Sequence, residues 1–182
     1  MTKGELLQLL DKIGVRPSRR LGQNFLTWLW CFLEERNGVL PQSKLGEFSM
    51  MIDGPLVFVS EGAGAFESVI RKGLPTISAE AKAALTVGKK LRQAKLILSR
   101  GRGEEWSVTV DADEFIFRGL KLPEGEALDP GSVFEERMTN LYVFQKVFFA
   151  LVQRFLTEMS DDGKRDAFQK MAKKWVADRD GR

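Results

Sequence analysis

Three strand-like segments follow one another closely, and they constrain the fold more than any other feature of this chain. They are residues 91–99, 104–111 and 114–122, and each is rich in β-branched, aromatic or other apolar side chains. The first two are joined by Arg-Gly-Arg-Gly and the last two meet at Asp-Ala-Asp. Connections this short join antiparallel neighbours, because a parallel crossover needs a dozen residues or more. The sequence therefore predicts an antiparallel sheet.

Segments with the apolar spacing of amphipathic helices lie on both sides of these strands: residues 4–13, 21–36, 132–159 and 164–179. A shorter helix is expected between Ser78, as its N-cap, and Gly88, as its C-cap. In the second helix the predicted core-facing stripe is Phe25, Leu26, Leu29, Trp30 and Leu33. All four tryptophans are expected in the core: Trp28, Trp30, Trp106 and Trp175.

The segment before the three strands adds further β-structure. Asp53-Gly54 stands between two apolar runs, which is the usual sign of a hairpin, and Pro55 indicates an edge or an imperfect hairpin. Another strand is expected from Phe66. The element order predicts an α+β fold, with an antiparallel sheet of about five to six strands packed against N- and C-terminal helices. We expect one domain over residues 1–160, followed by a basic C-terminal helix over 161–182.

Two absences exclude several classes of enzyme. The chain has no histidine, which removes Ser-His and Cys-His nucleophiles, histidine general bases and histidine metal ligands. It has one cysteine, Cys31, within an apolar run, so neither an intramolecular disulfide nor a cysteine metal cluster can form. Cys31 is expected to be a buried, small apolar residue.

The chain is expected to be cytoplasmic. Its longest apolar stretch, residues 141–156, is interrupted by polar and charged side chains and is too short to cross a bilayer. The N-terminal residues mix acidic side chains with leucines and lack the continuous apolar core of a signal peptide. The net charge of +3 permits an anionic partner without requiring one.

Three short segments resemble ribosomal RNA adenine dimethyltransferases: Arg-Arg-Leu-Gly-Gln-Asn-Phe-Leu at 19–26, Ser-Glu-Gly-Ala-Gly-Ala-Phe at 60–66 and Thr-Asn-Leu-Tyr at 139–142. The family's glycine-rich loop joins a buried strand to a helix, where backbone amides bind the cofactor. Here the segment after the glycines is predicted to be a strand. Asn140 lies within a helical periodicity, and its motif lacks the family's proline. An enzyme of this class is therefore the third choice.

A wider resemblance covers residues 21–157. The segments Phe-Leu-Thr-Trp-Leu-Trp at 25–30, 70–98 and Trp-Ser-Val-Thr-Val-Asp onward from 106 resemble, in order and spacing, the C-terminal portion of the recombination-associated protein RdgC family. The N-terminal half of that family has no counterpart here. The resemblance implies a non-enzymatic protein that modulates recombination, as a ring-shaped homodimer binding duplex DNA without sequence preference.

Binding of this kind needs lysines and arginines arrayed on one face. The candidate residues are Arg71, Lys72, Lys89, Lys90, Arg92, Arg100 and Arg102. Each small cluster taken alone is more typical of an ordinary solvated surface, so a protein-interaction or structural module without DNA affinity is the alternative.

No catalytic residue, metal site, cofactor or small-molecule substrate is predicted. Asp111 and Asp113 could hold Mg²⁺ if they lay on one side of an extended strand, but acids between strands more often form turns.

Overall fold

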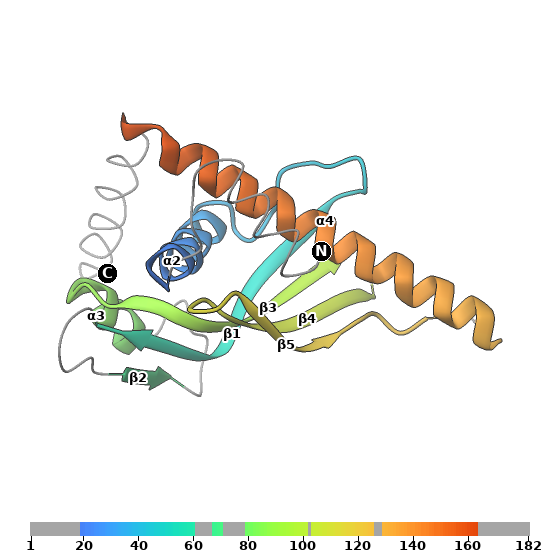
Figure 1. Ribbon diagram of the computed structural model, residues 1–182, viewed down its shortest axis with the longest axis horizontal. Helices are drawn as coiled ribbons and strands as arrows, with labels where there is room; N and C mark the ends of the chain where they lie inside the picture. The colour runs from blue at the N-terminus through green and yellow to red at the C-terminus, as the bar shows by residue number, and fades with distance from the viewer. Residues whose placement is uncertain (1–18, 61–66, 71–78, 102, 126–128, 164–182) are drawn as a thin grey trace.

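The structure, a computed structural model, describes residues 19–60, 67–70, 79–101, 103–125 and 129–163 (Figure 1). The elements are α2 (Arg19–Glu35), β1 (Phe48–Val59), β2 (Glu67–Ile70), α3 (Ala79–Thr86), β3 (Lys90–Arg100), β4 (Glu104–Asp111), β5 (Ile116–Lys121) and α4 (Pro130–Ser160). The strands form one antiparallel sheet in the order β2-β1-β3-β4-β5. The predicted α+β class is confirmed: an antiparallel sheet of five strands packs against N- and C-terminal helices. The predicted helices at 4–13 and 164–179 lie outside the described residues.

The three closely spaced strands predicted from the sequence are β3, β4 and β5. β3 pairs with β4 without interruption from Gln93, opposite Asp111, to Arg100, opposite Glu104. The register places Leu96 opposite Val108 and faces both side chains toward the core. β5 starts at Ile116, two residues later than predicted, because residues 112–115 form the turn.

The predicted hairpin at Asp53-Gly54 is wrong. β1 continues through this point as one twelve-residue strand, and both of its halves pair with β3. Asp53 lies opposite Lys95 and Val57 opposite Gln93, with the irregularity between them absorbed as a shift in register. The Asp53 carboxylate accepts a hydrogen bond from the Gly54 amide at 2.8 Å, so the local turn signal is real. Pairing with the long β3 strand outweighs it, and the signal produces a bulge instead of a reversal.

Both α2 and α4 cover the same face of the sheet (Figure 1). Phe148 of α4 contacts Phe25 of α2 (5.5 Å between ring centroids) and Phe117 of β5 (4.8 Å). The indole of Trp106, fully buried on β4, donates a hydrogen bond to the Asn140 carbonyl of α4 at 3.0 Å. These contacts join sheet and helices in one core, which includes three of the four predicted tryptophans. Trp175 lies outside the described residues.

Helix α2 is buried on more than the predicted stripe. Its five stripe residues are in the core as expected, and Trp28 and Cys31 are buried, as was also predicted. Phe32 is buried as well. Trp28 lies against Phe155 of α4 and donates a hydrogen bond to Glu158 at 2.9 Å. Because α2 packs against both the sheet and α4, it needs two apolar faces.

The start of α2 lies unusually close to the turn between β4 and β5. A Cβ atom at Gly22 would lie 1.8 Å from the carbonyl oxygen of Ala112, so only glycine fits. The next residue, Gln23, donates a hydrogen bond to Asp113 in the same turn at 2.6 Å. The Leu-Gly-Gln-Asn segment, which resembles a methyltransferase signature, therefore has a structural role here: it docks α2 on the sheet.

The remaining helix ends follow the expected chemistry. The Asp129 carboxylate accepts hydrogen bonds from the amides of Gly131 and Ser132 and starts α4 at Pro130. Gly88 follows α3 with a φ of +81°, the left-handed conformation expected of a C-cap glycine. The predicted N-cap Ser78 lies outside the described residues.

Candidate nucleic-acid interface

The four predicted DNA-binding residues that the structure describes do not form one patch. Lys89, Lys90 and Arg92 lie at the start of β3, whereas Arg100 is its last residue. At about 3.3 Å per residue, the two ends of this strand are roughly 30 Å apart. Arg71, Lys72 and Arg102 lie outside the described residues.

Lys89, Lys90 and Arg92 form a basic cluster at the end of the sheet nearest β2. The ammonium group of Lys89 donates a hydrogen bond to the Ser68 hydroxyl of β2. Lys90 lies opposite Val59 of β1 in the strand register. Because Gly88 caps α3 immediately before them, the backbone that carries these side chains is held between a helix end and a sheet. We refer to these three residues as the β3 basic cluster.

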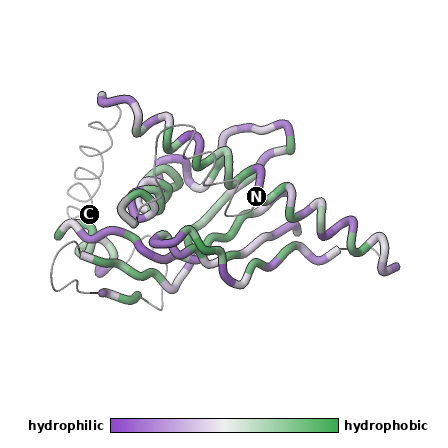
Figure 2. Tube along the Cα trace, in the orientation of Figure 1, coloured by the Kyte–Doolittle hydropathy of each residue, from purple (hydrophilic) through white to green (hydrophobic). Residues whose placement is uncertain are grey.

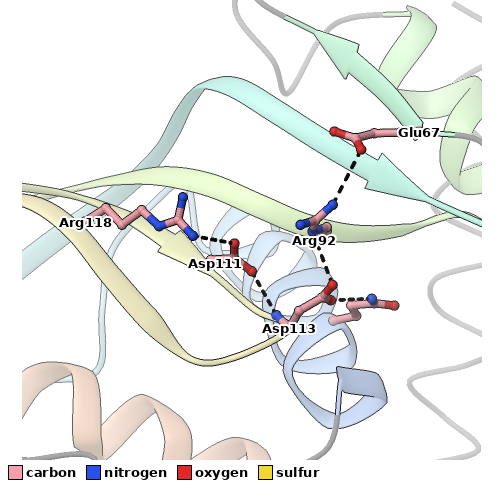
Figure 3. A network of polar contacts seen from close by, with 6 residues as sticks. Glu67, Arg92, Asp111, Asp113 and Arg118 are labelled. Atoms are coloured by element: carbon pink, nitrogen blue, oxygen red, sulfur yellow. Dashed lines mark hydrogen bonds and ion pairs between the residues drawn. The ribbon is translucent and has the colours of Figure 1, made fainter.

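Arg92 also belongs to a chain of charged groups that extends from β2, by way of β3, to the turn between β4 and β5 (Figure 3). Its guanidinium lies 3.5 Å from the Glu67 carboxylate of β2 and 3.2 Å from the Asp113 carboxylate in the β4–β5 turn. Beside them, Arg118 of β5 lies 3.3 Å from Asp111, the last residue of β4. The hollow lined by Arg92, Asp111, Asp113, Glu114 and Arg118 has a volume of about 350 Å³.

The two aspartates of this hollow stabilise the turn that follows β4 and form ion pairs with arginines. The Asp111 carboxylate, with 6% of its side chain exposed, accepts a hydrogen bond from the Asp113 amide at 3.1 Å. Each carboxylate faces a guanidinium group, which opposes the binding of a second cation. Among the residues that the structure describes, no three acidic or cysteine side chains are grouped as metal ligands. The geometry is that of the turn-forming alternative.

Arg100 is held within the fold. It forms an ion pair with Glu104, and its guanidinium lies 5.7 Å from the ring centroids of both Phe48 and Trp106. The hydrogen bond from Arg100 lowers the pKa of Glu104 and raises that of Arg100 itself, as expected for a charged pair in direct contact. A phosphate at this position would compete with Glu104.

Sequence reasoning missed three members of the polar network, Gln23, Glu67 and Arg118. Gln23 lies on the predicted helix between apolar positions, and Arg118 lies in a predicted strand. A polar residue beside a core stripe is a weak signal, and the partner of each is more than five residues away in the sequence. The roles of Gln23 and Arg118 became visible only when α2 and β5 were placed around the 112–115 turn.

The segments that resemble a methyltransferase are arranged differently from that family's site. The glycine-rich residues 60–66 connect β1 to β2, which are antiparallel neighbours, and not a strand to a helix. Asn140 is buried inside α4, as its helical spacing predicted.

None of the protein-family models, curated proteins and solved structures compared with this chain matches it. In the described part of the chain, no helix has the length and apolar character needed to cross a membrane.

Proposed function

We propose that this chain is a cytoplasmic, non-enzymatic protein that binds duplex DNA weakly and without sequence preference. As its resemblance to part of RdgC implies, it would modulate recombination. The observation that supports the proposal is the β3 basic cluster: three cations within four residues, on a backbone held by the end of α3 and by pairing with β1. A rigid array of this kind can follow phosphates without reading bases.

The surroundings of the cluster favour weak binding. Arg92 already has two carboxylate partners, Glu67 and Asp113, and further along β3 the ammonium group of Lys95 lies 3.1 Å from Asp53. DNA would have to displace these partners or share the cations with them. Because the contacts are electrostatic, affinity should fall steeply as salt rises.

The test is a titration of a labelled duplex at low and moderate salt. With three phosphate contacts, the logarithm of the association constant should fall with the logarithm of salt concentration with a slope of about −2.7. Lys89→Glu with Lys90→Glu should abolish most of this binding and flatten the slope by about 2. Absence of binding at low salt would refute the proposal.

A matched control has the same change in net charge at a different place. Arg36→Glu with Lys44→Glu replaces two exposed cations near the loop that follows α2. This pair should reduce affinity only slightly, through the general field of the protein. If both double variants weaken binding equally, the β3 basic cluster is not the site.

A second candidate function is a protein-interaction module without DNA affinity. It is favoured by the exposed apolar side chains of α4, Phe134, Met138 and Tyr142. The absence of DNA binding, together with self-association or a stable protein complex, would support it. The third candidate, an RNA adenine methyltransferase, requires binding of S-adenosylmethionine, which calorimetry measures directly.

A further inference from the structure

The N-terminal third of α4 has no buried side chain. The buried residues of this helix begin at Asn140, and in Figure 1 its first turns extend beyond the strands. Hydrophobic positions nevertheless continue along this extension (Figure 2). Phe134 is 64% exposed, Met138 49% and Tyr142 53%; a single exposed apolar side chain is ordinary, whereas several together on one helix indicate an interaction surface.

These side chains belong to one stripe. With 3.6 residues per turn, Phe134, Met138, Leu141, Tyr142 and Phe149 lie on the same side of the helix. Leu141 and Phe149 are only partly buried and are not among the residues packed against the core. Further along the same side of the helix, Val152 is buried and Leu156 packs against the core, so the stripe is the part of this side that precedes them. We refer to these five residues as the α4 stripe.

We infer that the α4 stripe binds the same stripe of a second copy of this chain, with the two helices antiparallel. Four of the five stripe residues are placed symmetrically about the midpoint between Leu141 and Tyr142, and the fifth, Met138, lies opposite Gln145 of the second copy. A two-fold axis there places Phe134 opposite Phe149 of the second copy and Leu141 opposite Tyr142 of the second copy. Such a self-complementary surface is what a two-fold dimer requires.

The charges beside the stripe agree with this arrangement. Glu135 and Lys146 are eleven residues apart, about three turns, and therefore lie on the same flank. The ammonium group of Lys146 lies 5.2 Å from the Tyr142 ring centroid, which places it at the edge of the stripe. Antiparallel pairing brings Glu135 of each copy near Lys146 of the other, twice per dimer. In a parallel pair, Glu135 would instead lie level with Glu135 of the second copy, and Lys146 level with Lys146 of the second copy.

The expected dimer is modest in strength. The stripe spans about four helical turns, so a helix pair of this length lies near the lower limit of specific interfaces. This inference concerns α4 alone and does not depend on DNA binding by the β3 basic cluster.

The experiment is sedimentation equilibrium of the full chain over a range of concentrations, without DNA. The wild type should approach twice the 20.5 kDa chain mass as concentration rises. Met138→Glu should weaken dimerisation by roughly a hundredfold or more, because two carboxylates would be desolvated. Since Met138 is half exposed in the monomer, circular dichroism should show an unchanged fold. A wild type that stays monomeric, or a dimer that tolerates Met138→Glu, would overturn the inference.

The register is tested by charge exchange. Glu135→Lys should weaken the dimer several-fold, and Glu135→Lys with Lys146→Glu should restore it. Failure of the double variant to restore it would exclude the antiparallel pairing proposed here.

Cross-linking gives a second measurement. Tyr142→Cys lies close to the axis and should form a disulfide-linked dimer under mild oxidation, whereas Thr157→Cys, exposed near the other end of α4, should not. The buried Cys31 does not compete, because burial raises its pKa to about 12. Equal cross-linking at both positions would contradict the inference.

Discussion

Replacement of Gly22 by alanine should destabilise the protein although alanine is the better helix former. Gly22 lies in the first turns of α2, where helix propensity alone would favour alanine by about 1 kcal/mol. The added Cβ would lie 1.8 Å from the Ala112 carbonyl oxygen and 2.8 Å from its carbon. Since both atoms belong to the backbone, relief requires α2 or the 112–115 turn to move by more than 1 Å, as judged from ordinary carbon–oxygen contact distances.

That movement would disturb what the docking of α2 holds together. The 2.6 Å hydrogen bond from Gln23 to Asp113 would lengthen, and the rings of Phe25 and Phe115, 6.1 Å apart, would separate. Overpacking costs about 1–3 kcal/mol and a hydrogen bond to a charged group about 1.5–3 kcal/mol. After the gain in propensity, we expect a net loss of about 3 kcal/mol. For a chain of this size the melting temperature should fall by about 6–12 °C.

Thermal and urea unfolding followed by circular dichroism measure this loss. The control is Gly131→Ala in the first turn of α4, where the nearest atom to a new Cβ is a flexible Asp129 carboxylate oxygen at 3.3 Å. Its stability should change by less than about 1 kcal/mol. If Gly22→Ala leaves the melting temperature unchanged or raises it, the close approach of α2 to the turn is refuted.

Three further predictions rest on individual charged or ionisable groups. Because burial raises the pKa of Cys31 to about 12, a thiol reagent at pH 8 should label it only after denaturant is added; rapid labelling of the native protein would contradict its burial. Arg100 lowers the pKa of Glu104, so this ion pair stabilises the fold at neutral pH, and its contribution disappears as pH falls below the ordinary carboxyl pKa. The wild type should therefore lose more stability between pH 6 and pH 3 than Glu104→Gln does. Equal losses would count against the pair. Arg118→Ala leaves the nearly buried Asp111 carboxylate without its cation and should lower the free energy of unfolding by about 1–2 kcal/mol. Adding Asp111→Asn should recover part of the lost stability. If the effects of the two changes simply add, the two residues are not coupled.

Local sequence predicted those parts of the fold in which neighbours in sequence are neighbours in space. β3, β4 and β5 are joined by turns too short for any other arrangement. Gly88 marks a helix end where it was expected, and α4 ends at Ser160, one residue after the predicted end. The stripe of α2 was correct because a helix against a sheet must bury one continuous face.

Long-range pairing decided the parts that local signals described incorrectly. Asp53 and Gly54 have the composition of a hairpin turn, yet β3 is long enough to pair with both halves of β1, and the sum of those ladder bonds outweighs one turn. In the same way, Phe32, which lies outside the predicted stripe, belongs to the core because α4 lies across the second side of α2, where Phe32 stacks on Trp28 and Trp28 contacts Phe155.

The candidate binding residues illustrate the same division. The sequence suggested seven lysines and arginines as one DNA-binding surface. In the structure, two of them, Arg92 and Arg100, lie at opposite ends of one strand. Each has carboxylate partners, which come from elsewhere in the sequence or from the next strand. By itself the sequence determined the α+β class, the antiparallel strands and the amphipathic helices, because these depend on periodicity and loop length. The tertiary structure alone decided which charges are neutralised, which glycine is indispensable and which apolar stripe of α4 stays uncovered, because each depends on what lies against a residue from distant parts of the chain.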